Sequence, residues 1–239
     1  MLLVYAVVRA LHVAGGMLGL LAMFVPLLAR KGGRLHRGAG KLFAAAMIVA
    51  GISGVAMAAV WLAAPRAFTA EAAVGTLRAN AVFLATLGLL LLCAVQQMLR
   101  ALTRKCQAAP RPSRLDLLLP AACVGAGATS VVVGVIAGAP LHLGFGALAV
   151  ARAVDDLRFV LRPLSTPRAW WYQHMSGAMV AIISATTAFL VIGGQRWLRG
   201  LLAPELGWTL WVAPTLVLVP VFSAWTARWR RRFGEAPGL

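Results

Sequence analysis

Seven long apolar runs, separated by short charged or proline-containing segments, constrain the fold of this chain more than any other feature. A helix that crosses a bilayer needs about 20 mostly apolar residues. Runs of that length cover residues 5–28, 43–64, 80–101, 117–138, 141–161, 173–194 and 208–227. Only 12% of the 239 residues are charged, whereas about 25% is usual in a soluble domain. The sequence therefore predicts an all-α, polytopic membrane bundle of seven transmembrane helices, built as one domain from residues 1–232 with a short cytoplasmic tail at 233–239.

The distribution of basic residues predicts how this bundle is oriented. Arginine and lysine are concentrated in every second connection, namely 30–41, 102–116, 162–168 and 228–232. The alternate connections hold fewer basic residues: Arg66 and Arg78, none at 138–141, and then Arg196 and Arg199. Because cytoplasmic loops carry the excess of positive charge, we expect the N-terminus outside and the C-terminus in the cytoplasm. The net charge of +17 then indicates contact with anionic lipid head groups and no nucleic-acid partner.

One group of ionisable residues is expected toward the outer face. Arg9 and His12 are spaced i, i+3 and share a helix face, and His142 opens the run 141–161 at a comparable depth. Two histidines at one depth could bind a b-type haem axially with Arg9 at a propionate, or hydrogen-bond a quinone head group. The alternative is that His12 pairs with a neighbouring helix and His142 only caps the run that it opens.

A second group is expected toward the cytoplasm. Its members are Asp155, Asp156, His174 and His36, with Arg152 and Arg158 as ion-pair partners. Arg152 is spaced to pair with both carboxylates, and Asp155 also reaches Arg158. Carboxylates with one or two histidines could hold a divalent metal ion or relay a proton. The alternative is a solvated charge cluster at a helix end, which needs no ligand.

Several functional classes are excluded by residues that the chain lacks. None of the three lysines lies within an apolar run, so a retinal Schiff base is excluded. The chain contains no Walker A, GxSxG or HExxH motif. Its three cysteines form no CxxC pair and are widely spaced, which supports neither a disulfide framework nor a zinc knuckle.

Two stretches of the chain carry a family resemblance. The first is His12 followed by Arg30-Lys31-Gly32-Gly33-Arg34-Leu35-His36-Arg37-Gly38-Ala39-Gly40-Lys41, and the second is Trp171-Tyr172-Gln173-His174-Met175 followed by Thr186-Thr187-Ala188-Phe189. With these stretches the chain resembles a bacterial predicted-membrane-protein family, the domain of unknown function 2306, over most of the first six runs. The resemblance implies a multi-pass protein of the bacterial cytoplasmic (inner) membrane, with matching positions at His12, His36, Arg37 and His174. It implies no reaction, and the run 208–227 and the basic tail extend beyond the family's usual pattern.

Three functions remain open on the sequence alone. The favoured hypothesis is a haem or quinone redox protein that uses His12 and His142. The first alternative is a small-solute or proton-coupled transporter that uses Asp155, Asp156 and His174, and the second is a membrane-embedded, metal-dependent enzyme at the same cluster. No catalytic residue is identified, and the expected partners are the lipid bilayer and either a second copy of the chain or a redox partner.

Overall fold

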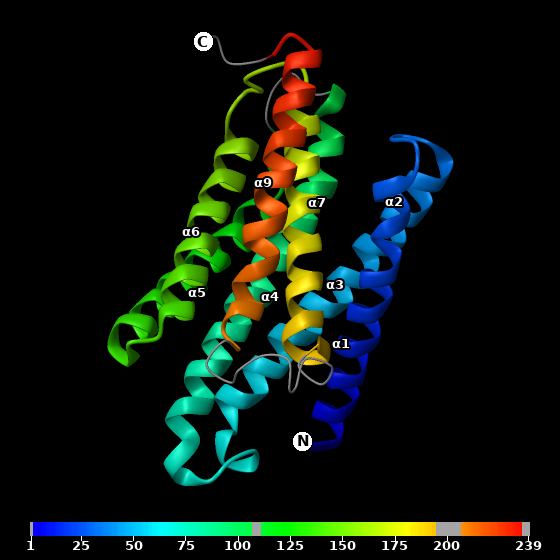
Figure 1. Ribbon diagram of the computed structural model, residues 1–239. Helices are drawn as coiled ribbons and strands as arrows, with labels where there is room; N and C mark the ends of the chain where they lie inside the picture. The colour runs from blue at the N-terminus through cyan, green and yellow to red at the C-terminus, as the bar shows by residue number, and fades with distance from the viewer. Residues whose placement is uncertain (1, 107–110, 195–206, 236–239) are drawn as a thin grey trace.

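The computed structural model describes residues 2–106, 111–194 and 207–235, and in these ranges the chain is helical without any strand. The long helices run roughly along one direction as a bundle (Figure 1). The helices are α1 Leu2–Ala22, α2 Phe24–Leu28, α3 Arg34–Ala63, α4 Val74–Thr103, α5 Arg114–Ala137, α6 Pro140–Leu161, α7 Ala169–Ala188 and α9 Thr209–Arg232. A π-helical segment, η4 Phe189–Gly194, extends α7, and short 3₁₀ turns lie at Pro65–Ala67, Glu71–Ala73 and Arg104–Cys106.

The predicted membrane character of the fold is confirmed for six helical segments, which are long and apolar enough to cross a bilayer. The remaining long helix, α6, is not among the six and carries Arg152, Asp155, Asp156 and Arg158 in its second half. It has 22 residues and packs alongside α5 (Figure 1).

Several helices begin or end in charged residues beyond the predicted apolar runs. α3 begins at Arg34 and not at residue 43, and α9 continues through Arg230, Arg231 and Arg232. Charged residues stop a chain from entering the bilayer, but arginine and lysine are good helix formers, so the helix itself continues past the membrane boundary.

Glycines set the closest helix contacts. A Cβ on Gly15 of α1 would lie 3.0 Å from the carbonyl oxygen of Ala46 on α3, and one on Gly146 of α6 would lie 2.7 Å from that of Gly127 on α5. Gly177 brings α7 equally close to α4, because its Cβ would lie 2.6 Å from the carbonyl oxygen of Ala94. Gly138 has a different role: its φ of +61° forms the left-handed end of α5.

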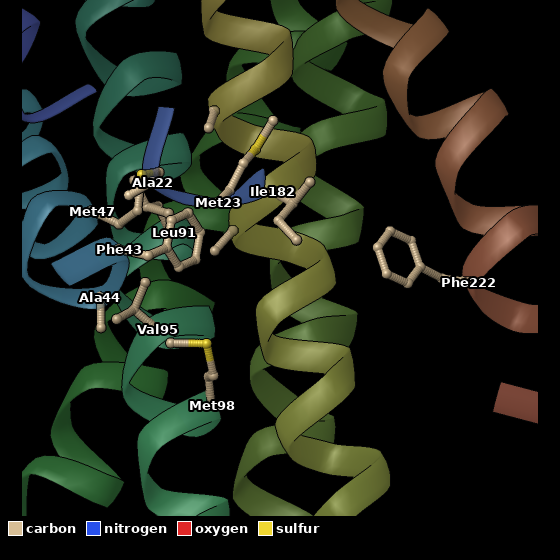
Figure 2. Packing of buried hydrophobic residues seen from close by; sticks show 12 residues of the cluster. Ala22, Met23, Phe43, Ala44, Met47, Leu91, Val95, Met98, Ile182 and Phe222 are labelled. Atoms are coloured by element: carbon tan, nitrogen blue, oxygen red, sulfur yellow. The ribbon is translucent and has the colours of Figure 1, made fainter. Parts of the chain in front are cut away.

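The largest apolar cluster joins α3, α4, α7 and the junction between α1 and α2. Figure 2 shows Met23, Phe43 and Leu91 gathered against α7, while Phe222 approaches from α9 on the other side. A second cluster joins α4, α5 and α6 and includes the buried thiols of Cys93 and Cys123. These two clusters hold α4 at the centre of the bundle.

The basic connections share one end of the bundle, which we call the basic end. It contains the turn before α3, the end of α4 with the start of α5, the link 162–168 and the end of α9 (Figure 1). The opposite end contains an exposed ion pair between Arg66 and Glu71, 2.6 Å apart, in which the arginine lowers the pKa of the glutamate. Arg196, Arg199 and residues 236–239 of the predicted tail lie outside the described residues.

Candidate functional site

A charged pair within α6 is the centre of the candidate site. The Nη2 atom of Arg152 lies 2.6 Å from Oδ1 of Asp156, one helical turn further along. The Asp156 side chain is 2% exposed and that of Arg152 is 9% exposed, so the pair is buried. Asp155 is 59% exposed and lies 3.9 Å from Arg152. The predicted pairing of Arg152 with both carboxylates is therefore confirmed, although only the pair with Asp156 is close and buried.

The predicted pair between Asp155 and Arg158 is not formed. No ion pair involves Arg158 among the described residues, and its side chain lines a cavity at the basic end. Asp155 is instead shared between Arg152 and the side-chain amide of Gln173, at 3.9 Å and 3.5 Å. Both Arg152 and Arg158 are three residues from Asp155, so the spacing allowed either pair. The contact with Gln173 of α7 accompanies the pair with Arg152.

α7 supplies polar partners to both members of the buried pair. Gln173 donates from Nε2 to Oδ1 of Asp156 at 3.2 Å, and Arg152 donates from Nη1 to the hydroxyl of Ser176. Gln173 and Ser176 are spaced i, i+3, so both side chains lie on the helix face toward α6. The close approach at Gly177 holds this part of α7 against α4. We did not predict Gln173 as a site residue, because a neutral amide beside a histidine carries no distinctive signal.

α4 closes the site from the third side. Gln97, which is buried, donates from Nε2 to the backbone carbonyl of Asp156 at 3.3 Å. The Oδ2 atom of Asp156 has no hydrogen-bond partner among the residues that the structure describes. A buried carboxylate oxygen without a partner is costly in the charged form, and a proton on this oxygen would remove that cost.

A second buried carboxylate provides a direct contrast. Asp116, in the first turn of α5, accepts from Gln96 at 2.7 Å and from the backbone N–H of Ser113 at 2.7 Å, and lies 2.9 Å from Nε of Arg100. Ser113 accepts in return from the Asp116 N–H, which completes a capping box. Both oxygens of Asp116 are paired, so its role is structural. The sequence signal for this role was the Ser-x-x-Asp spacing.

A cavity of about 300 Å³ lies at the basic end beside the buried pair. Its walls come from the end of α6, the link to α7, the first turns of α7 and the end of α9. Gln173 borders this cavity and also donates to Asp156, so one side chain contacts both the cavity and the buried carboxylate. Arg104 fixes the end of α6 by donating to the carbonyls of Phe159 and Arg162, and burial lowers the pKa of this arginine.

The helix that contains His12, α1, and the helix that contains His142, α6, lie on opposite sides of the bundle, with α4 and α7 between them (Figure 1). His12 donates from Nδ1 to the carbonyl of Ala50 on α3 at 2.8 Å. His142 is buried against Ser130, whose hydroxyl lies 3.3 Å from Nδ1, and against the ring of Phe83. Arg9 is exposed. The structure therefore does not bring together the two histidines that we expected to share a cofactor.

The other two histidines also bond to neighbouring backbone. His36 donates from Nδ1 to the carbonyl of Pro26 at 3.0 Å, and His174 donates to that of Met98 at 2.8 Å. No hydrogen bond or ion pair joins either of them to Asp155 or Asp156 in the described residues. Within the same residues, no three histidine, cysteine or acidic side chains lie together in a group that could hold a metal ion. The cytoplasmic cluster that we predicted thus separates into an Asp–Arg–Gln site and two histidines outside it.

No protein-family model, curated protein or solved structure matches this chain. The resemblance to the domain of unknown function 2306 stays a prediction.

Proposed function

We propose that the chain is a seven-helix protein of the bacterial cytoplasmic membrane that couples the movement of a small solute to that of a proton. The proposal treats α6 as the seventh spanning helix. At about 1.5 Å per residue, a helix of its length is about as long as the hydrocarbon core is thick. The pairing of Arg152 with Asp156 offsets part of the cost of placing its charges within the bilayer.

The proposed orientation places the basic end in the cytoplasm. The basic connections lie together at that end of the bundle (Figure 1), in agreement with the bias that orients membrane proteins. In this orientation the cavity beside Gln173 opens toward the cytoplasm, and the anionic lipids of the inner leaflet meet the arginines of α9.

The observation that carries the transport function is the unpartnered Oδ2 of Asp156 beside a buried arginine. Ionisable residues inside membrane bundles mark proton and substrate pathways. When Asp156 is charged, it holds Arg152 through Oδ1. When Oδ2 takes a proton, the charge that attracts Arg152 to Asp156 is lost, and the guanidinium keeps Ser176 and the more distant Asp155 as its partners. Proton binding at one atom thereby changes the contact between α6 and α7.

The position of Gln173 couples solute binding in the cavity to the protonation of Asp156. Its amide contacts Asp156 on one side and borders the cavity on the other. A solute that binds in the cavity therefore competes for the hydrogen bond that holds Asp156 in its charged form. By linkage, a solute that favours one protonation state of Asp156 is bound more tightly in that state.

A flux measurement tests this function. The purified protein is reconstituted into liposomes that contain a trapped pH indicator, with acidic medium and inorganic phosphate outside. An anion is used as the probe because arginines line the cavity. We expect the native protein to acidify the lumen faster when phosphate is present, and Asp156→Asn to behave like protein-free liposomes. Glu71→Gln, which removes a carboxylate at the opposite end, should keep the native rate. Equal rates for the native protein and Asp156→Asn would reject the proposal.

A second candidate function is electron transfer through a bound haem. It is favoured by the hydrogen bonds that orient three of the histidine rings. His12, His36 and His174 each direct Nδ1 to a backbone carbonyl, which leaves Nε2 as the other ring nitrogen. Histidines that bind a metal or haem iron are oriented by such second bonds. An optical spectrum of the purified protein, oxidised and then reduced with dithionite, tests this role. A Soret band that His12→Ala removes would support it, and a colourless protein from haem-replete cells would reject haem binding.

A further inference from the structure

We propose that the cavity at the basic end binds a phosphoryl group, carried either by a small soluble anion or by a lipid head group. The identification of this ligand as the transported solute rests on the function proposed above, whereas binding itself does not.

The cavity contains positive charge that the protein does not neutralise. Arg158 and Arg162, from the end of α6, and Arg230, from α9, all line it. The guanidinium groups of Arg158 and Arg162 have no hydrogen-bond or ion-pair partner among the residues that the structure describes. The guanidinium of Arg230 lies 4.7 Å from the centre of the Tyr172 ring and has no carboxylate partner in the same residues.

The two carboxylates in the cavity wall are already engaged by other groups. Glu235 accepts from the Tyr172 hydroxyl at 2.7 Å and lies 3.9 Å from Arg168. Asp155 lies 3.9 Å from Arg152. Each acid is therefore paired with an arginine that does not line the cavity. The three arginines that line the cavity therefore have no carboxylate partner among the described residues, so their positive charges favour an anionic ligand.

The neutral donors in the wall favour an oxyanion. α7 begins at Ala169 in this wall, so the positive end of its dipole lies at the cavity. The hydroxyl-bearing residues Ser165 and Thr166 line the same side. A phosphoryl group offers several oxygens to such donors and accepts paired hydrogen bonds from guanidinium groups.

The size of the cavity limits what can carry the phosphoryl group. A volume of about 300 Å³ is at the lower limit for ligand pockets. It suits a phosphate ester with a small substituent, or the head group of an anionic lipid whose acyl chains stay in the bilayer. In both cases the phosphoryl group itself is what the arginines recognise.

The test measures binding directly and needs no proton gradient. The protein in a neutral detergent is dialysed to equilibrium against radiolabelled inorganic phosphate. In parallel, native mass spectrometry records which lipid stays bound when phosphatidylglycerol and phosphatidylcholine are offered together. The variant Arg158→Gln/Arg162→Gln removes two cavity charges. The matched control Arg228→Gln/Arg231→Gln removes two charges at the same end but outside the cavity.

We expect the cavity variant to weaken binding by on the order of tenfold or more, because hydrogen bonds to charged groups contribute about 1.5–3 kcal/mol each. The control should bind like the native protein. Loss of phosphate binding in the cavity variant identifies a soluble ligand, and loss of phosphatidylglycerol retention alone identifies a lipid head group. Equal weakening in both variants, or no binding of either probe by the native protein, would overturn the proposal.

Asp156→Asn separates this inference from the transport function. The variant keeps all three cavity arginines, so it should still bind phosphate, unlike the cavity variant, even where proton-coupled flux is lost; linkage to Asp156 shifts only its affinity. Binding without coupled flux in the native protein would reject transport and leave the binding site standing.

Discussion

One oxygen of the Asp156 carboxylate lies 2.6 Å from the guanidinium of Arg152, while the other has no hydrogen-bond partner among the described residues. A buried ion pair that served packing alone would be expected to satisfy both oxygens, as the pair of Asp116 with Arg100 does. The same helix bundle thus contains one complete and one incomplete buried carboxylate. This difference distinguishes the fully paired acid, Asp116, from the acid that we propose takes up a proton, Asp156.

Because both oxygens of Asp116 are paired, removal of this side chain is predicted to lower the stability of the protein. Asp116→Ala removes the partner of Arg100 and the acceptor of Gln96 and Ser113. Breaking a buried pair from one side costs about 3–5 kcal/mol, so the free energy of unfolding, measured by titration with a denaturing detergent, should fall by an amount of that order. Glu71→Ala, at an exposed pair, should leave it unchanged. An unaltered unfolding curve for Asp116→Ala would contradict the structural role.

The contact at Gly177 predicts that even one methyl group separates α7 from α4. In Gly177→Ala the new Cβ would lie 2.6 Å from the Ala94 carbonyl oxygen and 2.8 Å from the Met98 nitrogen, and backbone cannot yield easily. Overpacking of this kind costs about 1–3 kcal/mol. Gly125→Ala is the matched control, because its Cβ meets nothing within 4 Å. Equal stability of the two variants would show that the helices do not approach as closely as described.

The buried thiols predict a specific cross-link between α4 and α5. Cys93 and Cys123 are fully buried and belong to the same cluster between α4, α5 and α6. Treatment of membranes with copper phenanthroline should therefore remove two of the chain's three thiols from later maleimide labelling of the denatured protein. Cys93→Ser should keep its remaining thiols reactive. Full labelling of the treated native protein would argue against the pairing of these helices.

Gln173 is predicted to act on coupling and not on folding. Gln173→Ala removes the hydrogen bond to Oδ1 of Asp156 but leaves the Arg152 pair in place. Loss of one hydrogen bond to a charged group, worth about 1.5–3 kcal/mol, corresponds to a decrease on the order of tenfold or more in coupled flux. Gln96→Ala, which acts on Asp116, should lower stability and leave the flux per folded molecule unchanged. A loss of stability without loss of flux in Gln173→Ala would contradict a role of Gln173 in coupling.

The apolar runs predicted the fold well because membrane insertion is decided by hydrophobicity and length. The predicted ends at 28, 64, 138 and 161 lie within one residue of the ends of α2, α3, α5 and α6, but other boundaries differ. The first run is interrupted near Met23, where α1 gives way to α2, and α3 starts within the basic loop. Pro120, Pro214 and Pro220 all lie inside helices, so proline alone did not mark the boundaries.

Contacts between site residues on the same helix could be predicted from the sequence, whereas contacts between residues on different helices could not. The spacing of Arg152 with Asp156 fixed their pairing, since residues four apart share a helix face. His12 and His142 were expected to meet because their depths match, but depth does not determine which side of a bundle a residue occupies. Gln97 and Gln173 reach Asp156 only because of how α4 and α7 pack against α6.

An infrared titration of the reconstituted protein tests most directly whether Asp156 takes up a proton, because protonated carboxyl groups are detected by their C=O stretch. We predict that acidification produces a carboxyl band in the native protein and in Asp155→Asn, and that this band is missing in Asp156→Asn. A band that survives in Asp156→Asn, or a native spectrum without one, would contradict the claim that Asp156 takes up the proton.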